Sequence, residues 1–182
     1  MINDIFYLQL LLKKYGINAE EYFKLKDIGG HSTYHLEGDA LKHSLMVYEE
    51  SLKMFPDNEV MHKAALLHDI GKIYTSIEVA PGDWVYPDHS TCGFFKGILC
   101  KFIDLKDTHF VDYQWIIRNH IRPLFWNKKG IATDNEVYGE LDKSICTLNN
   151  LRNLAICDLK GSKPKDEKAS EELIAYLNNL IL

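Results

Sequence analysis

The chain has 182 residues, of which 46% are hydrophobic and 26% charged, and its formal net charge is −5 at pH 7. This length suits one domain with a core large enough to fold without disulfides, and the hydrophobic content excludes an intrinsically disordered chain. Because affinity for a nucleic-acid backbone comes from clustered Lys and Arg, the acidic balance argues against a broad nucleic-acid-binding surface.

Most of the chain shows apolar residues at the spacing of amphipathic helices, separated by residues that stop a helix. Gly16 follows the first of these patterns, and Pro56 follows the second. Residues 75–88 differ, because their apolar residues flank Pro81-Gly82, which predicts a loop or a short hairpin. The sequence predicts helices over residues 3–15, 38–55, 58–69, 89–104, 109–120, 136–159 and 166–181.

These patterns predict an all-α fold, a single-domain helical bundle. No internal repeat, low-complexity tract or linker divides the chain. We expect N-terminal helices within residues 1–34 to pack on a core formed by residues 35–161, and a C-terminal helix within residues 162–182 to complete the domain.

The sequence shows no feature of a secreted or membrane protein. The first residues alternate polar with apolar side chains, unlike a signal peptide, and no stretch approaches the roughly 18 apolar residues of a membrane-spanning helix. No two cysteines form a Cys-x-x-Cys pair, which argues against a zinc ribbon or a dithiol redox motif. We therefore expect a cytoplasmic protein without a membrane partner, with reduced core cysteines at positions Cys92, Cys100, Cys146 and Cys157.

Six side chains stand out as candidate ligands of a divalent metal. His68 and Asp69 are adjacent at the end of an apolar helix, where an unpaired charge is costly and a bound metal is one compensation. The other four lie on four further predicted helices or helix ends, as expected where a helical bundle converges its ligands on the interior. All six are oxygen or nitrogen ligands, and none is a thiolate. The set is His43, His68, Asp69, His89, His120 and Asp158.

The remaining histidines are expected to be ordinary core or surface residues, because a lone histidine on an apolar helix is more often a satisfied side chain than a ligand. His35 is a partial exception. It lies with Glu37 where a loop enters the helix of His43, so either residue could contact substrate or support the ligands. The other three are His31, His62 and His109.

The candidate ligands belong to an ordered series of short motifs. A bare His-Asp pair would be a weak signal, whereas the whole series in one order is specific. The motifs are HLEGD at residues 35–39, ALLHDIGK at residues 65–72, His89 with Gly93, His120 with Pro123, and the late Asp158.

In this order of motifs, residues 35–161 resemble the HD superfamily of metal-dependent phosphohydrolases, which is named for its His-Asp pair. Within it they are most similar to the HD domain of bacterial CCA-adding tRNA nucleotidyltransferases. The nucleotidyltransferase head of those enzymes is absent from this sequence, so CCA addition is not implied. The resemblance implies a helical phosphohydrolase domain with phosphatase, nucleotidase or cyclic phosphodiesterase activity.

The resemblance also implies how a metal would be held. His43, His68, Asp69 and Asp158 would bind a first divalent ion, and Asp69 would bridge to a second ion held by His89 and His120. A single-ion site remains open, with His89 or His120 instead contacting phosphate or water. The ligands suit Mn, Fe, Ni, Co, Zn or Mg alike.

Two residues are candidates for direct roles in catalysis. Asp69 would accept a hydrogen bond from the attacking water. Lys72, one helical turn beyond His68, would contact the phosphate oxygens as a point charge. The alternative for Lys72 is a solvated residue at the end of its helix.

Further residues are candidates for substrate binding. Arg118 and Arg122 bracket His120 and would clamp a phosphate, since a guanidinium binds phosphate bidentately; surface salt bridges are the alternative. Phe125 and Trp126 would stack on a base or belong to the core. His35 completes the proposed substrate-binding set of Lys72, Arg118, Arg122 and His35.

Three functions remain open at this point. The first is metal-dependent hydrolysis of a nucleotide phosphomonoester or a 2′,3′-cyclic phosphodiester. The second is hydrolysis of a dinucleotide polyphosphate or another phosphate ester. The third is a non-catalytic module that binds RNA or protein, against which the intact ligand set and the acidic charge argue. We therefore expect a small phosphorylated substrate, a nucleotide, and no long nucleic acid.

Overall fold

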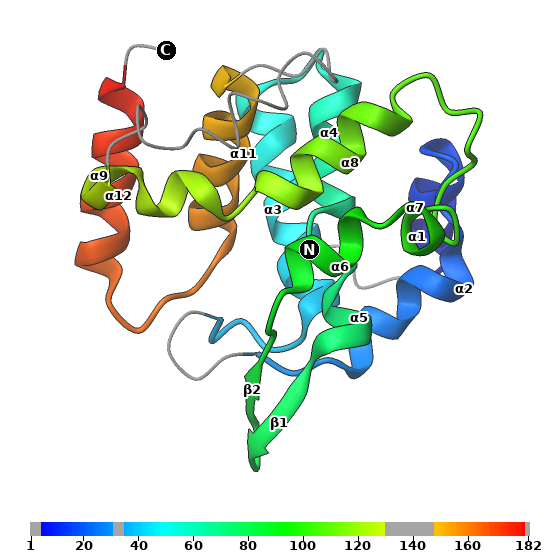
Figure 1. Cartoon of the computed structure of the whole chain (residues 1–182), viewed down its shortest axis with the longest axis horizontal. Coiled ribbons are helices and arrows are strands. Elements are labelled where there is room, and N and C mark those ends of the chain that lie inside the picture. Colours follow the sequence, from blue (N-terminus) through cyan, green and yellow to red (C-terminus); the bar gives the residue numbers. More distant parts are fainter. Residues whose placement is uncertain (1–4, 31–34, 130–147, 181–182) are drawn as a thin grey trace.

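The structure is a computed structural model that describes residues 5–30, 35–129 and 148–180. Its α-helices are α1 (Ile5–Lys14), α2 (Ala19–Tyr22), α3 (Ala40–Met54), α4 (Glu59–Leu67), α5 (Lys72–Thr75), α6 (His89–Phe94), α7 (Lys96–Leu99), α8 (Phe110–Asn119), α9 (Trp126–Lys129), α11 (Leu148–Gly161) and α12 (Glu167–Asn179). The other described elements are the 3-10 helices η1 (Phe23–Asp27) and η2 (Arg122–Phe125) and the strands β1 (Ile77–Ala80) and β2 (Asp83–Val85). Helices therefore dominate, as predicted, with one small hairpin (Figure 1).

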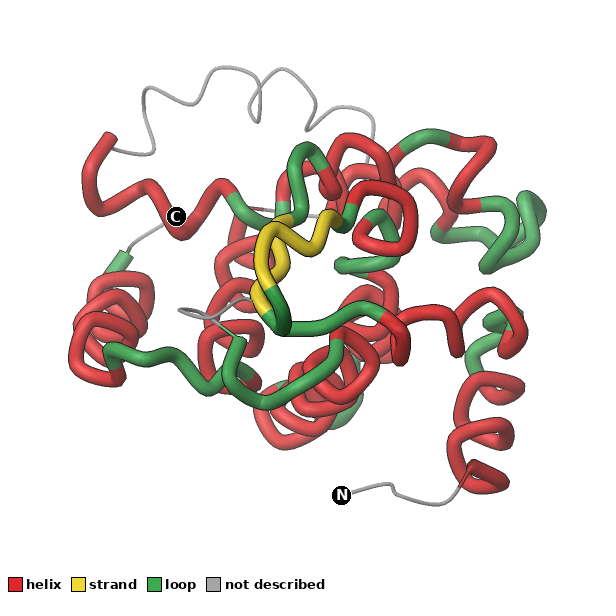
Figure 2. The backbone as a smooth tube through the Cα atoms, turned by 90° about the horizontal axis from the view of Figure 1, so that it is seen from below, coloured by secondary structure: helices red, strands yellow, loops and turns green. Residues whose placement is uncertain are grey.

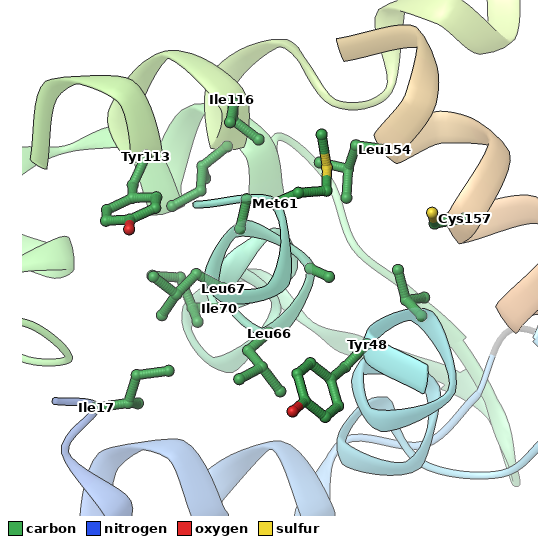
Figure 3. Packing of buried hydrophobic residues seen from close by; sticks show 14 of the residues in the cluster. Ile17, Tyr48, Met61, Leu66, Leu67, Ile70, Tyr113, Ile116, Leu154 and Cys157 are labelled. Carbon is green, nitrogen blue, oxygen red and sulfur yellow. The ribbon is translucent and has the colours of Figure 1, made fainter. Parts of the chain in front are cut away.

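Helix α4 lies at the centre of the fold. Every residue from Met61 to Leu67 is buried, and helices α3, α8 and α11 all contact α4. Figure 3 shows this packing, with Leu66 of α4 close to Tyr48 of α3. A helix that is buried on all sides carries whatever follows it into the interior. This is how the chain brings His68 and Asp69, directly after α4, deep into the domain.

Two polar residues of α4 are buried, and each has partners. The ring of His62 lies between the Tyr15 hydroxyl, 3.3 Å from Nδ1, and the Phe55 carbonyl oxygen, 2.7 Å from Nε2. The Nζ atom of Lys63 lies 2.5 Å from Oδ2 of Asp107. Buried polar groups without partners destabilise a fold, so these contacts allow α4 to be enclosed. His62 is thus the satisfied core histidine that the sequence predicts.

Side-chain caps set where three long helices begin. Asp39 caps α3, Asn58 caps α4 and Asp166 caps α12, each accepting a hydrogen bond of 2.8–3.0 Å from the backbone N–H three residues on. Each cap satisfies a donor that the first turn leaves unpaired. The structure confirms, to within two residues at each end, the helices predicted over residues 3–15, 38–55, 58–69, 109–120 and 166–181.

The predicted loop or hairpin over residues 75–88 is a hairpin, in which β1 pairs antiparallel with β2. Gly82 in its turn has φ +76°, which favours glycine. The hairpin projects beyond the helices in Figure 1, and Figure 2 views it from below. The end of the hairpin nearest the helices is anchored to the loop at Gly29, because the Tyr86 hydroxyl donates a hydrogen bond to the Gly29 carbonyl. A Cβ on Gly29 would lie 2.3 Å from the Trp84 ring, so the packing of Trp84 against the backbone at this position requires glycine.

The prediction of a single helix over residues 89–104 is wrong. The chain forms α6 and α7 there, and Phe95 between them has an extended backbone with φ −57° and ψ 128°. After this break the chain turns to bury Leu99 and Phe102, and the Phe102 carbonyl accepts the N–H of Asn18. Apolar spacing does not record such a change of direction, because the same residues also fit one longer helix.

Two other predictions are met only in part. Of the helix predicted over residues 136–159, residues 136–147 lie outside the described residues, and α11 continues past 159 to Gly161.

Cys157 is buried as expected and Cys92 is half-buried, but Cys100 is exposed at the turn after α7, so the core assignment is wrong for Cys100. Cys146 and His31 lie outside the described residues. None of the described helices combines the length and apolar character that crossing a membrane requires.

Candidate metal centre

Five helices bring the six candidate ligands into one buried cluster. Four of the side chains are only 1–2% exposed, and the other two, His89 and Asp158, are 14% exposed. The ligands come from α3 (His43), the turn after α4 (His68 and Asp69), the start of α6 (His89), the end of α8 (His120) and α11 (Asp158).

One group of ligand atoms gathers around Oδ2 of Asp69. This oxygen lies 3.3 Å from Nε2 of His68 and 3.5 Å from Nε2 of His43. Oδ1 of Asp158 lies 3.1 Å from the same His43 nitrogen and 4.0 Å from Nε2 of His68. Atoms that bind one ion at about 2.0–2.2 Å lie about 3–3.6 Å from their neighbours, which these four atoms approach.

A second group gathers around the other carboxylate oxygen of Asp69. Oδ1 lies 3.3 Å from Nε2 of His89 and 3.6 Å from Nε2 of His120. The two histidine nitrogens are 3.2 Å apart. Asp69 therefore faces one histidine pair with each oxygen, which is the arrangement of a carboxylate that joins two cation sites.

Hydrogen bonds at the far side of three rings fix which nitrogen faces the centre. Nδ1 of His68, of His89 and of His120 lies 2.8, 2.9 and 2.7 Å from the carbonyl oxygen three residues earlier in the chain. A carbonyl only accepts, so each Nδ1 carries the proton and each Nε2 presents a lone pair to the cluster. Histidine ligands of metals are held in this way.

The side chains fit a bound cation, because several of their buried atoms lack a favourable partner within the described residues. The Nε2 atoms of His43 and His68 face each other at 3.3 Å, as do those of His89 and His120 at 3.2 Å. Lone pairs that face each other repel unless a cation or proton lies between them. Oδ2 of Asp69 is buried and accepts no hydrogen bond of good geometry from the described residues, although the Lys72 ammonium pairs with it at 2.6 Å. A divalent ion at each group would satisfy all of these atoms.

The electrostatics of the cluster favour positive charge beside the carboxylates. Burial alone would raise the pKa of Asp69, but Lys72 and His68 outweigh it and hold this pKa well below its ordinary value. Burial alone would lower the pKa of His43, but the carboxylates of Asp158 and Glu37 outweigh it and raise this pKa to about 9. Asp158 likewise has a lowered pKa despite its burial, because His43 lies against it.

Lys72 begins α5 and is buried, so its interpretation as a solvated residue at a helix end is wrong. Its Nζ atom lies 2.6 Å from Oδ2 of Asp69 and 4.5 Å from the centre of the Tyr86 ring. The ammonium is thereby held at the edge of the cluster, against the carboxylate that both ligand groups share.

Three side chains at the cluster keep partial exposure to solvent. His35 is 20% exposed, and its ring centre lies 4.5 Å from that of His43. The other two are His89 and Asp158, each 14% exposed. His35 thus lies where the sequence places a substrate contact, and that role stays a prediction.

The other proposed substrate contacts are Arg118, Arg122, Phe125 and Trp126. The Arg118 guanidinium stacks 4.8 Å from the centre of the Phe94 ring, and the half-buried Arg122 begins η2. Trp126 is 2% exposed, which supports the core alternative for it, whereas Phe125 is 48% exposed. The phosphate-clamping role of the two arginines also stays a prediction.

Sequence reasoning missed Tyr86. Its carbonyl accepts from the ring of His89, its hydroxyl anchors the hairpin to Gly29, and its ring lies beside Lys72. The available signal is its position three residues before His89, which matches the spacing of the other carbonyl-bound histidines. His109 is an ordinary histidine, as expected, with Nδ1 2.9 Å from Asp112.

An all-helical domain that gathers four histidines and two aspartates in its interior belongs to the class of candidate metalloenzymes. A family model, the HD domain, matches residues 40–150. The chain therefore belongs to the HD domain family, whose members are generally metal-dependent hydrolases. A search of curated proteins and a search of solved structures each found no match.

Proposed function

We propose that this protein hydrolyses a small nucleotide phosphate, either a phosphomonoester or a 2′,3′-cyclic phosphodiester, with water activated at the metal centre. The observation that carries the proposal is the position of Asp69, whose two oxygens face two separate histidine pairs. Divalent ions, when bound, supply a Lewis acid for the phosphoryl oxygens and lower the pKa of water at the site. His43, His68, Asp69 and Asp158 would hold one ion, and Asp69, His89 and His120 the other.

The side chains around the ligands would position the reacting groups. Asp69 is the acceptor closest to both ligand groups, so it would accept a hydrogen bond from the attacking water. Lys72 has three N–H donors and uses one of them toward Asp69. It can therefore contact a phosphoryl oxygen at the same time, without leaving the carboxylate. Such a fixed donor favours the charge that develops on phosphate in the transition state.

Three features support a small nucleotide as the substrate. His35, His89 and Asp158 keep 14–20% exposure beside the buried ligands, and His35 would contact the substrate there. The net charge of −5 disfavours a long RNA, which needs many cationic contacts. The motifs of residues 35–161 led us to expect a likeness to the HD domain of CCA-adding enzymes, and on that expectation we propose a nucleotide. Arg118 and Arg122 would supply further phosphate contacts.

The test is a hydrolysis panel with metal-loaded protein. The panel contains nucleoside monophosphates, 2′,3′-cyclic nucleotides, dinucleotide polyphosphates and a structured RNA, each at about 50 and 200 mM salt. Asp69→Asn is the inactive variant, and Asp112→Asn removes a buried carboxylate that pairs with His109 instead. We expect turnover of a mononucleotide that Asp69→Asn abolishes and Asp112→Asn retains. Turnover of RNA alone, or activity that survives Asp69→Asn, would refute the proposal.

A further inference from the structure

We infer that Glu37 is a positioning residue, which fixes the proton on Nδ1 of His43 and ties the loop before α3 to the segment after α11. This inference rests on the proposed metal centre. Glu37 lies in the loop ahead of α3, and its carboxylate is fully buried, with a side-chain exposure of 0%. A buried carboxylate is costly unless each oxygen has donors, so its partners define its role.

One oxygen of Glu37 faces two histidines. Oε1 lies 2.9 Å from Nδ1 of His43 and 2.9 Å from Nδ1 of His35. The His35 contact has the geometry of a hydrogen bond, whereas Nδ1 of His43 approaches the carboxylate as an ion pair. Nε2 of the same His43 ring faces His68, Asp69 and Asp158. A carboxylate on the outer nitrogen also makes a histidine ligand more basic than a carbonyl does.

The position of His43 in its helix explains why a carboxylate is needed. His68, His89 and His120 lie at helix ends, where a carbonyl three residues earlier accepts from the ring. His43 is the fourth residue of α3, and carbonyls inside a helix accept the backbone N–H four residues on. Among the described residues no carbonyl of α3 accepts from Nδ1 of His43, and the carboxylate that lies 2.9 Å from this nitrogen belongs to Glu37, outside the helix.

The second oxygen of Glu37 links the first and last ligand-bearing helices. Oε2 accepts the backbone N–H of Lys163 at 2.9 Å, and the Lys163 carbonyl accepts the N–H of Leu36 at 3.0 Å. Lys163 follows α11, five residues after Asp158. The Glu37 side chain thus holds the loop before His43 against the segment that follows Asp158. His43 and Asp158 belong to the same ligand group.

The donors around Glu37 make it sensitive to an isosteric change. His43, His35 and Lys163 all approach the carboxylate, which only accepts. A glutamine offers one acceptor and two N–H donors in the same space, so it cannot serve all three. Either the Lys163 contact is lost or the ring of His43 loses its acceptor.

The experiment compares wild type with Glu37→Gln and with the matched control Asp112→Asn, which alters another buried carboxylate–histidine pair. Asp112 is eight residues before His120 on α8, about 12 Å along the helix. The first readout is the affinity for Zn²⁺ alone, by competition with a chelator. The second is the Nδ1 proton of His43, by ¹H–¹⁵N NMR with and without Zn²⁺.

We expect Glu37→Gln to weaken one Zn²⁺ by about 10–100-fold and to weaken or shift the Nδ1 proton signal, with Asp112→Asn like wild type in both. Equal Zn²⁺ affinity and an unchanged proton signal in Glu37→Gln would overturn the inference. If that variant does not fold, the wild-type spectrum decides, because a His43 without a proton on Nδ1 contradicts the role of Glu37. A wild-type protein that binds no divalent ion would instead contradict the proposed function, while the proton signal would still test Glu37.

Discussion

Gly71 and His89 lie so close together that a Cβ atom on Gly71 would be 1.8 Å from the His89 carbonyl oxygen. The backbone of Gly71 is helical, with φ −63° and ψ −25°, so any residue could adopt it, and the requirement is for space. On α6, Gly93 faces the same contact, since its Cβ would lie 3.2 Å from the Gly71 nitrogen. This close approach of α5 and α6 places His89 beside Asp69.

We predict that Gly71→Ala displaces α6 and weakens the second ion selectively. A methyl group against a backbone carbonyl cannot be accommodated by rotating a side chain, so a cost of about 1–3 kcal/mol in the free energy of unfolding is expected. The measurement is metal stoichiometry with thermal unfolding. Gly97→Ala on α7 is the control, because nothing lies within 4 Å of the added methyl. Full occupancy of both ions in Gly71→Ala would show that this contact does not position His89.

Gly161 plays the corresponding part in the first ligand group. A Cβ there would lie 2.7 Å from the Val47 nitrogen, where α11 crosses α3. Asp158 is one turn before Gly161 and His43 is one turn before Val47, so a shift here would lengthen their 3.1 Å contact. We predict for Gly161→Ala a loss of about 1–3 kcal/mol in unfolding free energy and weaker binding of the first ion. Chelator competition measures the affinity, and a variant that matches wild type would contradict this prediction.

The Lys63–Asp107 pair predicts a pH dependence of stability away from the metal centre. Burial would raise the pKa of Asp107, but Lys63 and the His109 N–H outweigh it and lower this pKa. A carboxyl with a lowered folded-state pKa stabilises the fold above its unfolded pKa of about 3.9, and this stabilisation is lost as pH falls through the folded value.

Asp107→Asn should therefore destabilise the protein by about 1–3 kcal/mol at pH 7, because it leaves the buried Lys63 without a charged partner. The difference from wild type should shrink as pH falls below about 4. Urea unfolding at several pH values measures this, with the exposed Asp57→Asn as the control. A difference that stays constant down to pH 2 would show that the ion pair is not its source.

The number of ions depends on the second ligand group. We predict that His120→Ala lowers metal occupancy by about one ion and leaves the first ion in place. The reason is that His120 faces Oδ1 of Asp69, the oxygen that belongs to the second ligand group. Anomalous scattering from metal-soaked crystals would locate the ions. A single peak at the His43 group, with His89 and His120 turned away, would establish a one-ion site.

Much of the site could be predicted because its residues follow one another in a specific order along the chain. The spacing from His43 through His68-Asp69 to Asp158 indicates the ligand set, and helical periodicity places each ligand on a helix or at its end. The sequence suggests Glu37 as a support for the ligands, but its contact with Lys163 could not be predicted, since the two residues are 126 positions apart and meet only through the packing of α3 on α11. The break at Phe95 was missed for a similar reason, because tertiary contacts at Leu99 decide it.

The most direct test of the account is the metal content and phosphate release of wild type beside the double variant His68→Ala, Asp69→Ala. Asp69 belongs to both ligand groups and His68 to the first, so removing the two side chains should abolish both sites. We predict a divalent transition metal in the purified wild type and metal-dependent hydrolysis of a nucleotide phosphate, with both lost in the double variant. Equal metal content in the two proteins, or hydrolysis that persists without these side chains, would contradict the account.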